Sequence, residues 1–237
     1  AYATGPGAAI PPVVGPKILT SIYHVPCFHL DVRSYLTNTV PMGAYRGAGR
    51  PEAIYLMERL VQKTAEEMGI DSLEFRKRNF IPPDAMPYTS PIGEIYDSGD
   101  FEKVLDKAIE LSEWNDFESR KENSQNKGRI RGRGISCYIE WTGAIWFEEV
   151  TTEARADGSV VLYTGTQNMG QGLKTAFTQL LSQQLELPVG KIEIVQGDTD
   201  LVKGKGSVGS RSLYIGGSAI REGAEKFLEE NRKLASE

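Results

Sequence analysis

Three glycine-rich segments carry the residues whose types and spacing could bind a ligand. The segment at 165–175, GTQNMGQGLKT, follows the strand-like run VVLYT and opens a helix with periodic apolar residues. Glycines let backbone amides approach a ligand, and the positive end of a helix dipole favours an anion such as a phosphate. The segment lacks the GxGxxG of a dinucleotide site and the GKS or GKT ending of a P-loop. Taken alone, it is more typical of a tight turn that needs glycines for packing.

A second segment at 203–218, KGKGSVGSRSLYIGGS, again joins a strand-like run to a helix. It offers several glycine amides and the hydroxyls of Ser207, Ser210 and Ser212. Two loops of this kind in one domain could hold a polyanionic cofactor from two sides. The alternative is a flexible, solvated loop.

The third segment, PMGAYRGAGRPEA at 41–53, places Arg46 and Arg50 beside small residues. The backbone could therefore approach a ligand closely while a guanidinium supplies fixed positive charge. One or both arginines could instead pair with Glu52 or with carboxylates on neighbouring helices.

Other site chemistries find less support. His24, Cys27 and His29 lie within six residues, but strand alternation sends Cys27 and His29 to one face and His24 to the other. Packing or hydrogen bonding is the favoured interpretation of these residues. No GxSxG nucleophile motif occurs, and segment 165–175 does not have lysine and carboxylate partners placed as nucleotide–metal chemistry requires.

Composition narrows the class of protein. A net charge of -5 argues against a nucleic-acid or anionic-membrane surface, which needs a basic face. The two cysteines, Cys27 and Cys137, lie far apart, so this chain alone builds neither a disulfide framework nor an iron–sulfur cluster. No leader opens the chain, and no run reaches the roughly 18 apolar residues of a membrane span. The expectation is a cytoplasmic protein.

The first half is predicted to be mixed in structure. Residues 18–36 are rich in β-branched and aromatic residues and predict two short strands. Helical spacing of apolar residues predicts a helix over 52–68 that stops at Gly69. Asp71 or Ser72 can cap a second helix through Arg78, and Asp100 can cap a third from Phe101 to about Leu111.

The polar stretch 115–129 is either a solvated helix or a linker, and a domain boundary is placed there. Beyond it the sequence predicts strands near 133–140, 146–155 and 159–163, the last two joined by a turn at Asp157 and Gly158. A helix over 172–187, a strand over 191–195, a loop and a long final helix complete an α+β chain.

Five separated motifs, in this order, resemble the molybdenum hydroxylase family of xanthine dehydrogenase, aldehyde oxidase and carbon monoxide dehydrogenase. They are TNTVPMGAYRGAGRPEA, GIDSLEFRKRNFI, CYIEWTG, YTGTQNMGQGLKTAF, and QGDTD followed by GSVGSRSLYIGGSAI. The resemblance implies part of a two-domain molybdenum cofactor-binding region. Residues 1–128 would be the C-terminal part of its first domain, with the active-site loop, and 129–237 the N-terminal part of its second.

The resemblance also implies which residues bind the cofactor. Gly170, Gln171 and Gly172 would contact the pterin, and Tyr45 and Arg46 would border the metal centre. A second loop would close on the cofactor near the metal, through Gly209, Ser210, Arg211 and Ser212. No residue of this chain is expected to ligate the metal directly.

Gly47, Ala48 and Gly49 would line the substrate pocket. Gly47 stands where carbon monoxide dehydrogenases carry a copper-ligating cysteine in an AYRCSFR loop, which argues against carbon monoxide as substrate. Ala48 stands where xanthine dehydrogenase-like members, with AFRGF, place an aromatic ring that stacks on a purine. Aldehydes and N-heterocycles remain open as substrates.

Members of this family hydroxylate a carbon with water as the oxygen source. A glutamate serves as general base, and electrons pass to iron–sulfur clusters and often to FAD. The family's upstream glycine-rich motif and its C-terminal glutamate base are expected outside this chain, which would be inactive alone. Expected partners are complementary large-subunit segments, an iron–sulfur subunit, a flavin subunit and a small-molecule substrate.

The pterin could be molybdopterin or its cytosine dinucleotide form. The alternative to an enzyme segment is a non-catalytic fragment or assembly module of the same fold that binds no metal.

Overall fold

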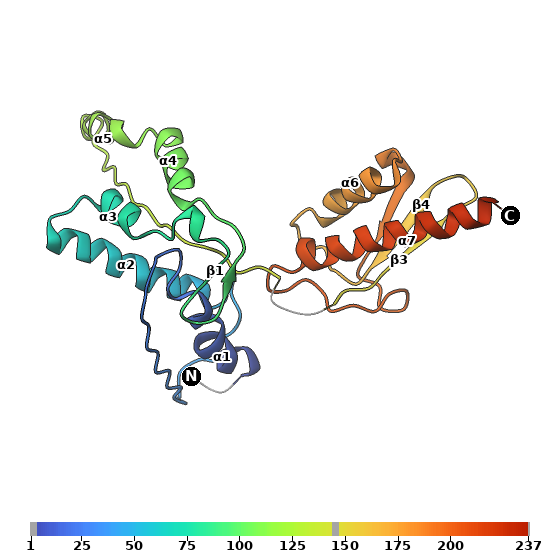
Figure 1. The fold of residues 1–237 in the computed structure, drawn as a ribbon, viewed down its shortest axis with the longest axis horizontal. Helices are drawn as coiled ribbons and strands as arrows, with labels where there is room; N and C mark the ends of the chain where they lie inside the picture. Colours follow the sequence, from blue (N-terminus) through green and yellow to red (C-terminus); the bar gives the residue numbers. More distant parts are fainter. Residues whose placement is uncertain (1–3, 144–146, 237) are drawn as a thin grey trace. The chain divides into compact units, whose positions relative to one another are not determined.

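The computed structural model describes residues 4–143 and 147–236. The chain divides into two compact units, Ala1–Glu140 and Trp141–Glu237, each of which is considered by itself (Figure 1). Within the described residues, no helix combines the length and the apolar character that crossing a membrane requires.

The first unit is mainly helical. Its longest helix is α2, and a two-stranded antiparallel sheet, β1 with β2, follows the short helix α3. The bounds are α1 Gly5–Ala9, α2 Arg50–Met68, α3 Ser72–Asn79, β1 Tyr88–Thr89, β2 Ile95–Tyr96, α4 Phe101–Leu111 and α5 Phe117–Gln125. Short π- and 3-10 turns span Ile10–Val14, Pro16–Ile18, Pro83–Ala85 and Trp114–Asp116.

The helix signals in the sequence are confirmed. The Asp71 carboxylate accepts hydrogen bonds from two amides at the start of α3, and Asp100 does the same for the Lys103 amide in α4. Gly69, at φ 66°, ends α2 in the left-handed conformation that glycine adopts without strain. The polar stretch near 115–129 was predicted to be either a solvated helix or a linker, and it forms the helix α5.

The strands predicted in two segments of this unit, 18–36 and 133–140, are wrong. Within 18–36 the only ladder contact is an isolated bridge between Tyr23 and Phe80, and 133–140 contains no strand. In the second segment Cys137 is nevertheless buried, and Ile135 and Ile139 pack against the same core. Neither segment has a neighbouring strand within the described residues, and a ladder needs one.

Buried apolar residues from several elements form the core of the first unit: Ile22, Tyr23, Val61, Phe80, Leu105 and Cys137. The carboxylate of Glu58 lies beside it and accepts hydrogen bonds from Tyr23 Oη, Arg76 and the Cys137 amide. This ties residues 129–140 to the first unit, whereas the sequence places its domain boundary at 128/129.

The second unit is a three-stranded sheet with two helices. Strands β3, Val150–Ala154, and β4, Val160–Thr164, are antiparallel, and β5, Ile192–Val195, runs parallel to β4. The β3–β4 connection closes through a hydrogen bond from the Arg155 amide to Ser159 O, as the Asp-Gly turn signal predicts.

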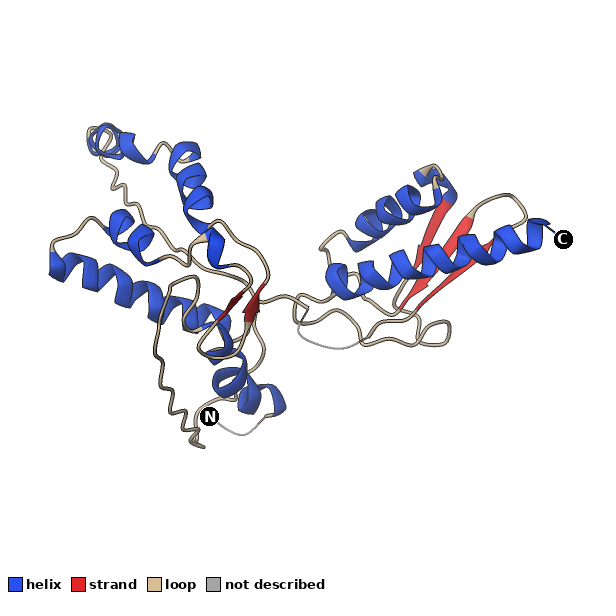
Figure 2. Cartoon of the chain, in the orientation of Figure 1, coloured by secondary structure: helices blue, strands red, loops and turns tan. Residues whose placement is uncertain are grey.

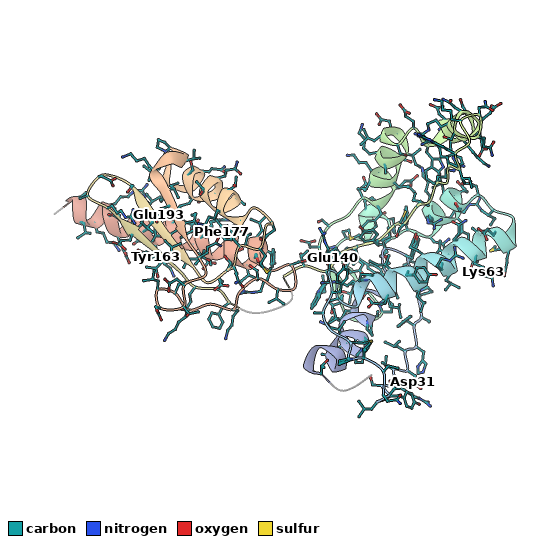
Figure 3. All side chains as sticks on the ribbon, turned by 180° about the vertical axis from the view of Figure 1, so that it is seen from behind. Asp31, Lys63, Glu140, Tyr163, Phe177 and Glu193 are labelled. Atoms are coloured by element: carbon teal, nitrogen blue, oxygen red, sulfur yellow. The ribbon has the colours of Figure 1, made fainter. Side chains whose placement is uncertain are left out.

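Helices α6, Leu173–Leu185, and α7, Gly217–Ser236, pack against each other and against the sheet (Figure 2). Phe177 of α6, labelled in Figure 3, is fully buried with Leu162 of β4 and Ile220 of α7. The helices and strands predicted after residue 146 are confirmed, and together with the first unit they confirm the α+β class.

Candidate functional site

The loop between β4 and α6 presents backbone at the start of a 13-residue helix. Gly170, at φ 95°, and Gly172, at φ 80°, take left-handed conformations that a side chain would strain. A Cβ added at either glycine would meet nothing within 4 Å, so the space beside the loop is open. The amides that begin α6 are therefore accessible to an anion.

The side chain of Gln171 closes this loop on itself. Its Nε2 donates to Gln167 O at 3.0 Å, and its Oε1 accepts from the Met169 amide at 2.5 Å. Gln171 thus shapes the loop, and what the loop offers a ligand is mainly its backbone.

The second glycine-rich loop is fastened to the first. Ser207 Oγ accepts from the Gln167 amide at 2.8 Å and donates to Gln167 O at 2.7 Å, while the Gly206 amide donates to Gly165 O at 3.2 Å. Ser212 Oγ donates to Ser207 Oγ at 2.8 Å. The structure thus brings together the two segments of the second unit that the sequence singled out.

Gly165 and Gly204 let the two loops touch backbone to backbone. A Cβ built on Gly165 would lie 2.2 Å from the Cα of Gly204, a distance that no side chain can occupy. The close approach therefore depends on both residues being glycine.

Arg211 anchors the second loop from inside the unit. Its Nη1 lies 2.7 Å from Glu148 Oε2 and donates to Gly206 O, and its Nη2 donates to Phe147 O. Both side chains are almost completely buried. The resemblance implies that Arg211 contacts the cofactor. Because its guanidinium faces the interior of the unit, a contact with the cofactor at this position would come from the Arg211 backbone.

Sequence reasoning missed Glu148. Its one available signal was an acidic residue inside the apolar run preceding β3, a position that demands a buried partner.

Gly209 and Ser210 make the bend before the final helix. Their φ angles are 59° and 58°, and Ser210 is exposed. Two consecutive residues with positive φ make a tight turn, and turns of this kind can present backbone amides to an anion. Exposed Lys203 and Lys205 lie on the same loop and add positive charge that the sequence analysis did not assign.

In the first unit, the loop before α2 has three consecutive left-handed residues. Gly47, Ala48 and Gly49 have φ angles of 90°, 37° and 87°. The Ala48 amide donates to Tyr45 O at 2.6 Å, and Arg50 Nε donates to Gly47 O at 2.6 Å. These bonds hold Ala48 in a conformation that L-residues seldom adopt.

The two arginines of this loop differ. Arg50 is buried and its Nε lies 3.1 Å from Glu140 Oε1, so it pairs with a carboxylate that the sequence analysis did not name. Tyr45 and Arg46 are exposed. Arg46 is thus the arginine that remains available to a ligand.

One cavity of this unit lies away from these loops. Its volume is about 540 Å³, and it is lined by residues of α2, α3, the 3-10 turn Trp114–Asp116 and 133–136, among them Tyr55, Glu66 and Trp114. None of the predicted site residues borders it. His24, Cys27 and His29 are exposed, and no group of three potential ligands among the described residues gathers for a metal ion.

Comparison with known proteins identifies the family of the chain. Two models of a molybdopterin cofactor-binding domain match the chain, one over residues 1–80 and another over 107–237. This chain belongs to the molybdopterin cofactor-binding family. The family resemblance seen in the sequence is confirmed, and the open glycine loops of the second unit fit a cofactor of anionic character.

Curated relatives agree. The chain is 32% identical over 221 residues to the gamma subunit of the 6-hydroxypseudooxynicotine dehydrogenase complex of Paenarthrobacter nicotinovorans, covering 91% of this chain and 28% of that protein. It is 33% identical over 237 residues to the carbon monoxide dehydrogenase large chain of Hydrogenophaga pseudoflava, covering 92% and 29%. The chain thus spans less than a third of the length of these relatives.

Solved structures share the fold. Carbon monoxide dehydrogenase from Oligotropha carboxidovorans superposes with a TM-score of 0.83 at 30% identity, over 93% of this chain and 30% of that one. Quinoline 2-oxidoreductase from Pseudomonas putida 86 gives 0.80 at 25% identity, over 92% and 29%.

Proposed function

We propose that this chain is a cofactor-binding section of the large subunit of a molybdenum hydroxylase. The reaction would hydroxylate an aldehyde or an N-heterocycle with water as the oxygen source. The observation that carries the proposal is the joining of loops 165–172 and 203–212 through Ser207 and Gln167, in a chain matched by two cofactor-domain models.

The second unit would hold the cofactor by its backbone. Amides at Gly170, Gln171 and Gly172 and the bend at Gly209 and Ser210 suit a phosphate-bearing pterin, with or without a cytosine nucleotide. Ser212 would reach it from the end of the second loop, and Arg211 would contribute through its backbone. The cofactor, when bound, would supply the two-electron oxidation.

The first unit would contribute Tyr45 and Arg46 beside the metal centre, with Gly47, Ala48 and Gly49 lining the substrate pocket. These last three positions carry neither a thiol nor an aromatic ring. Carbon monoxide and purines are therefore disfavoured. Quinoline, for which one structural relative is named, is an N-heterocycle of the class proposed here.

Electrons would leave through iron–sulfur clusters and FAD on partner subunits. Complementary large-subunit segments would supply the rest of the cofactor envelope and the glutamate base, because the chain spans only 28–29% of the curated relatives compared above. The chain alone would then be inactive, since general-base catalysis contributes orders of magnitude in rate. The complex would work in the cytoplasm.

One observation favours the alternative, a non-catalytic module that binds no metal. The amide of Gln171 and the guanidinium of Arg211 are engaged by their own loops, so these two side chains have a structural use without any ligand. The open glycine surface at the start of α6 favours the enzyme segment, because packing within the unit leaves that space unfilled.

The deciding experiment is molybdenum content, measured by elemental mass spectrometry on the complex isolated from its native cells. We expect close to stoichiometric molybdenum in the wild type and at least a threefold loss in Gln171→Ala. Gln183→Ala, the same change at an exposed position of α6, is the matched control and should keep its molybdenum. Unchanged content in Gln171→Ala would refute the pterin assignment. Absence of molybdenum from the wild-type complex would establish the alternative.

A further inference from the structure

The loop at 47–49 is fixed at its second end by close packing. Gly49 is buried and lies against residues 10–15, where an added Cβ would come within 2.9 Å of both Gly15 N and Ile10 O. This approach holds the backbone of Gly49 in place. The rest of the loop depends on hydrogen bonds.

Arg50 holds the first end of the loop. Gly47 O accepts from the Arg50 amide at 3.3 Å and from Arg50 Nε at 2.6 Å. Ala48 lies between the two ends with a φ of 37°, a conformation that an L-residue keeps only where its surroundings hold it. The position of the Arg50 guanidinium therefore decides whether the loop keeps this shape.

Glu140 sets the position of that guanidinium. Its Oε1 lies 3.1 Å from Arg50 Nε, in a pair whose arginine side chain is only 5% exposed. A buried guanidinium is costly unless a carboxylate balances its charge. Glu140, labelled in Figure 3, is the last residue of the first unit, so a residue far along the chain controls the loop.

We propose that Glu140 is a positioning residue for the substrate pocket and acts on residues 47–49 through Arg50. The inference rests on the proposed function, because that function assigns these three residues to the pocket. Two of them are glycines and the third is an alanine, so the backbone sets the shape of this wall. A displaced loop would therefore fit the substrate less well and raise KM.

The first test is hydrogen exchange, read by mass spectrometry on the complex isolated from native cells. Glu140→Gln keeps the size of the side chain and removes its charge. We expect the amides of Ala48 and Arg50 to exchange at least about tenfold faster in this variant, because their hydrogen bonds open more often. Helix α4, elsewhere in the same unit, should keep its rate within about twofold.

Two results of this test would overturn the proposal. Unchanged exchange at Ala48 and Arg50 would show that Glu140 does not hold the loop. Equal acceleration in the loop and in α4 would show that Glu140 serves the stability of the whole unit and has no special effect on the loop.

Glu74→Gln is the matched control. It removes a carboxylate whose Oε1 lies 2.7 Å from the Nε of another arginine, Arg78, on the surface of α3. Loop exchange should change by less than about twofold, because an exposed ion pair contributes little. Glu140→Asp retains the charge and should keep loop exchange within about threefold of the wild type. A tenfold acceleration in either variant would contradict the role given to the Glu140 charge.

A double-mutant cycle tests whether Glu140 acts through Arg50. In an Arg50→Met background the guanidinium is absent, so Glu140→Gln should change loop exchange by less than about twofold. A full effect of Glu140→Gln in this background would overturn the proposed route.

Steady-state kinetics of the same complexes test the consequence for the substrate. Quinoline and benzaldehyde, one from each proposed substrate class, are the probes. Glu140→Gln should raise KM by at least about fivefold, whereas a loss of folded enzyme would lower only the number of active complexes. Turnover with the wild-type KM would overturn the proposal. Faster loop exchange in a complex without molybdenum would uphold the control of the loop by Glu140 and refute the proposed function.

Discussion

Glu148 and Arg211 form a buried ion pair with a separation of 2.7 Å between Oε2 and Nη1, although 63 positions separate them in the sequence. Arg211 also donates to the carbonyl oxygens of Gly206 and Phe147. The pair therefore fixes the second glycine loop to the chain that enters β3. The shape of the proposed cofactor surface depends on a carboxylate that does not itself reach that surface.

Removing one member of this pair should be costly. Glu148→Ala leaves a buried guanidinium without its carboxylate, and we expect the free energy of unfolding to fall by about 3–5 kcal/mol. Urea unfolding monitored by circular dichroism measures this. Glu225→Ala, which breaks the exposed i,i+4 pair with Arg221, is the control and should change stability by less than about 1 kcal/mol. Similar losses of unfolding free energy in both variants would show that the buried Glu148–Arg211 pair stabilises the fold no more than the exposed pair does.

The contact between the two glycine loops predicts the effect of a single methyl group. Gly165→Ala would place its Cβ against the Cα of Gly204, and we expect a destabilisation of about 1–3 kcal/mol from overpacking, together with lower molybdenum content. Thermal unfolding and elemental analysis measure the two effects. Gly190→Ala adds the same methyl where nothing lies within 4 Å and should leave molybdenum content unchanged. A wild-type molybdenum content in Gly165→Ala would show that cofactor binding does not depend on the contact between the two loops.

The loop before α2 makes a parallel prediction for the first unit. Gly49→Ala adds a Cβ at φ 87°, only 2.9 Å from both Gly15 N and Ile10 O. Backbone strain and the clash act together, so we expect a loss of at least about 1 kcal/mol in denaturant unfolding. Gly43→Ala, at an open position without positive φ, is the matched control. A Gly49→Ala variant as stable as that control would contradict the described packing.

Burial raises the pKa of the Cys137 thiol to about 11, with the nearby Glu58 carboxylate adding to the effect. Burial also raises the pKa of Tyr96 to about 12. Both groups hold their protons more tightly in the folded chain, so their contribution to stability is complete below about pH 9 and is lost as the pH rises through these values.

The free energy of unfolding should therefore fall more between pH 8 and pH 10.5 in the wild type than in Cys137→Ala. Cys27→Ala removes an exposed thiol and serves as the control, with a pH dependence like that of the wild type. A Cys137→Ala variant with the wild-type pH dependence would show that the buried thiol does not contribute.

Local signals in the sequence predicted the helices well. Caps such as Asp71 and Asp100 act within three residues of the helix they begin, so their effect is visible without the rest of the fold. The Asp-Gly turn joining β3 and β4 is equally local.

Pairing between distant segments was not visible in the sequence. Residues 133–140 were predicted to form a strand; Cys137 is buried there, but a strand also needs a neighbour that the local sequence does not specify. The same holds for 18–36, where residues 18–22 form turns and the described residues make no ladder beyond the isolated bridge between Tyr23 and Phe80.

For the candidate site, glycines pointed to the right loops because positive φ restricts the residue type. The roles of the side chains were harder to assign. Arg211 faces Glu148 and Arg50 faces Glu140, and each partner lies more than 60 positions away in the sequence. An arginine in a glycine-rich loop predicts a charge contact without saying whether the partner is a ligand or the protein.

The carboxylate of Glu58 acquires its donors from residues that leave the ribosome at very different times. Tyr23 precedes it, Arg76 follows soon after, and the Cys137 amide comes 79 residues later. Until then the carboxylate lacks one of the donors that hold it in a buried site. The first unit can therefore complete its core only after Cys137 has been synthesised, and nascent chains halted before that residue should be open to proteases and chaperones.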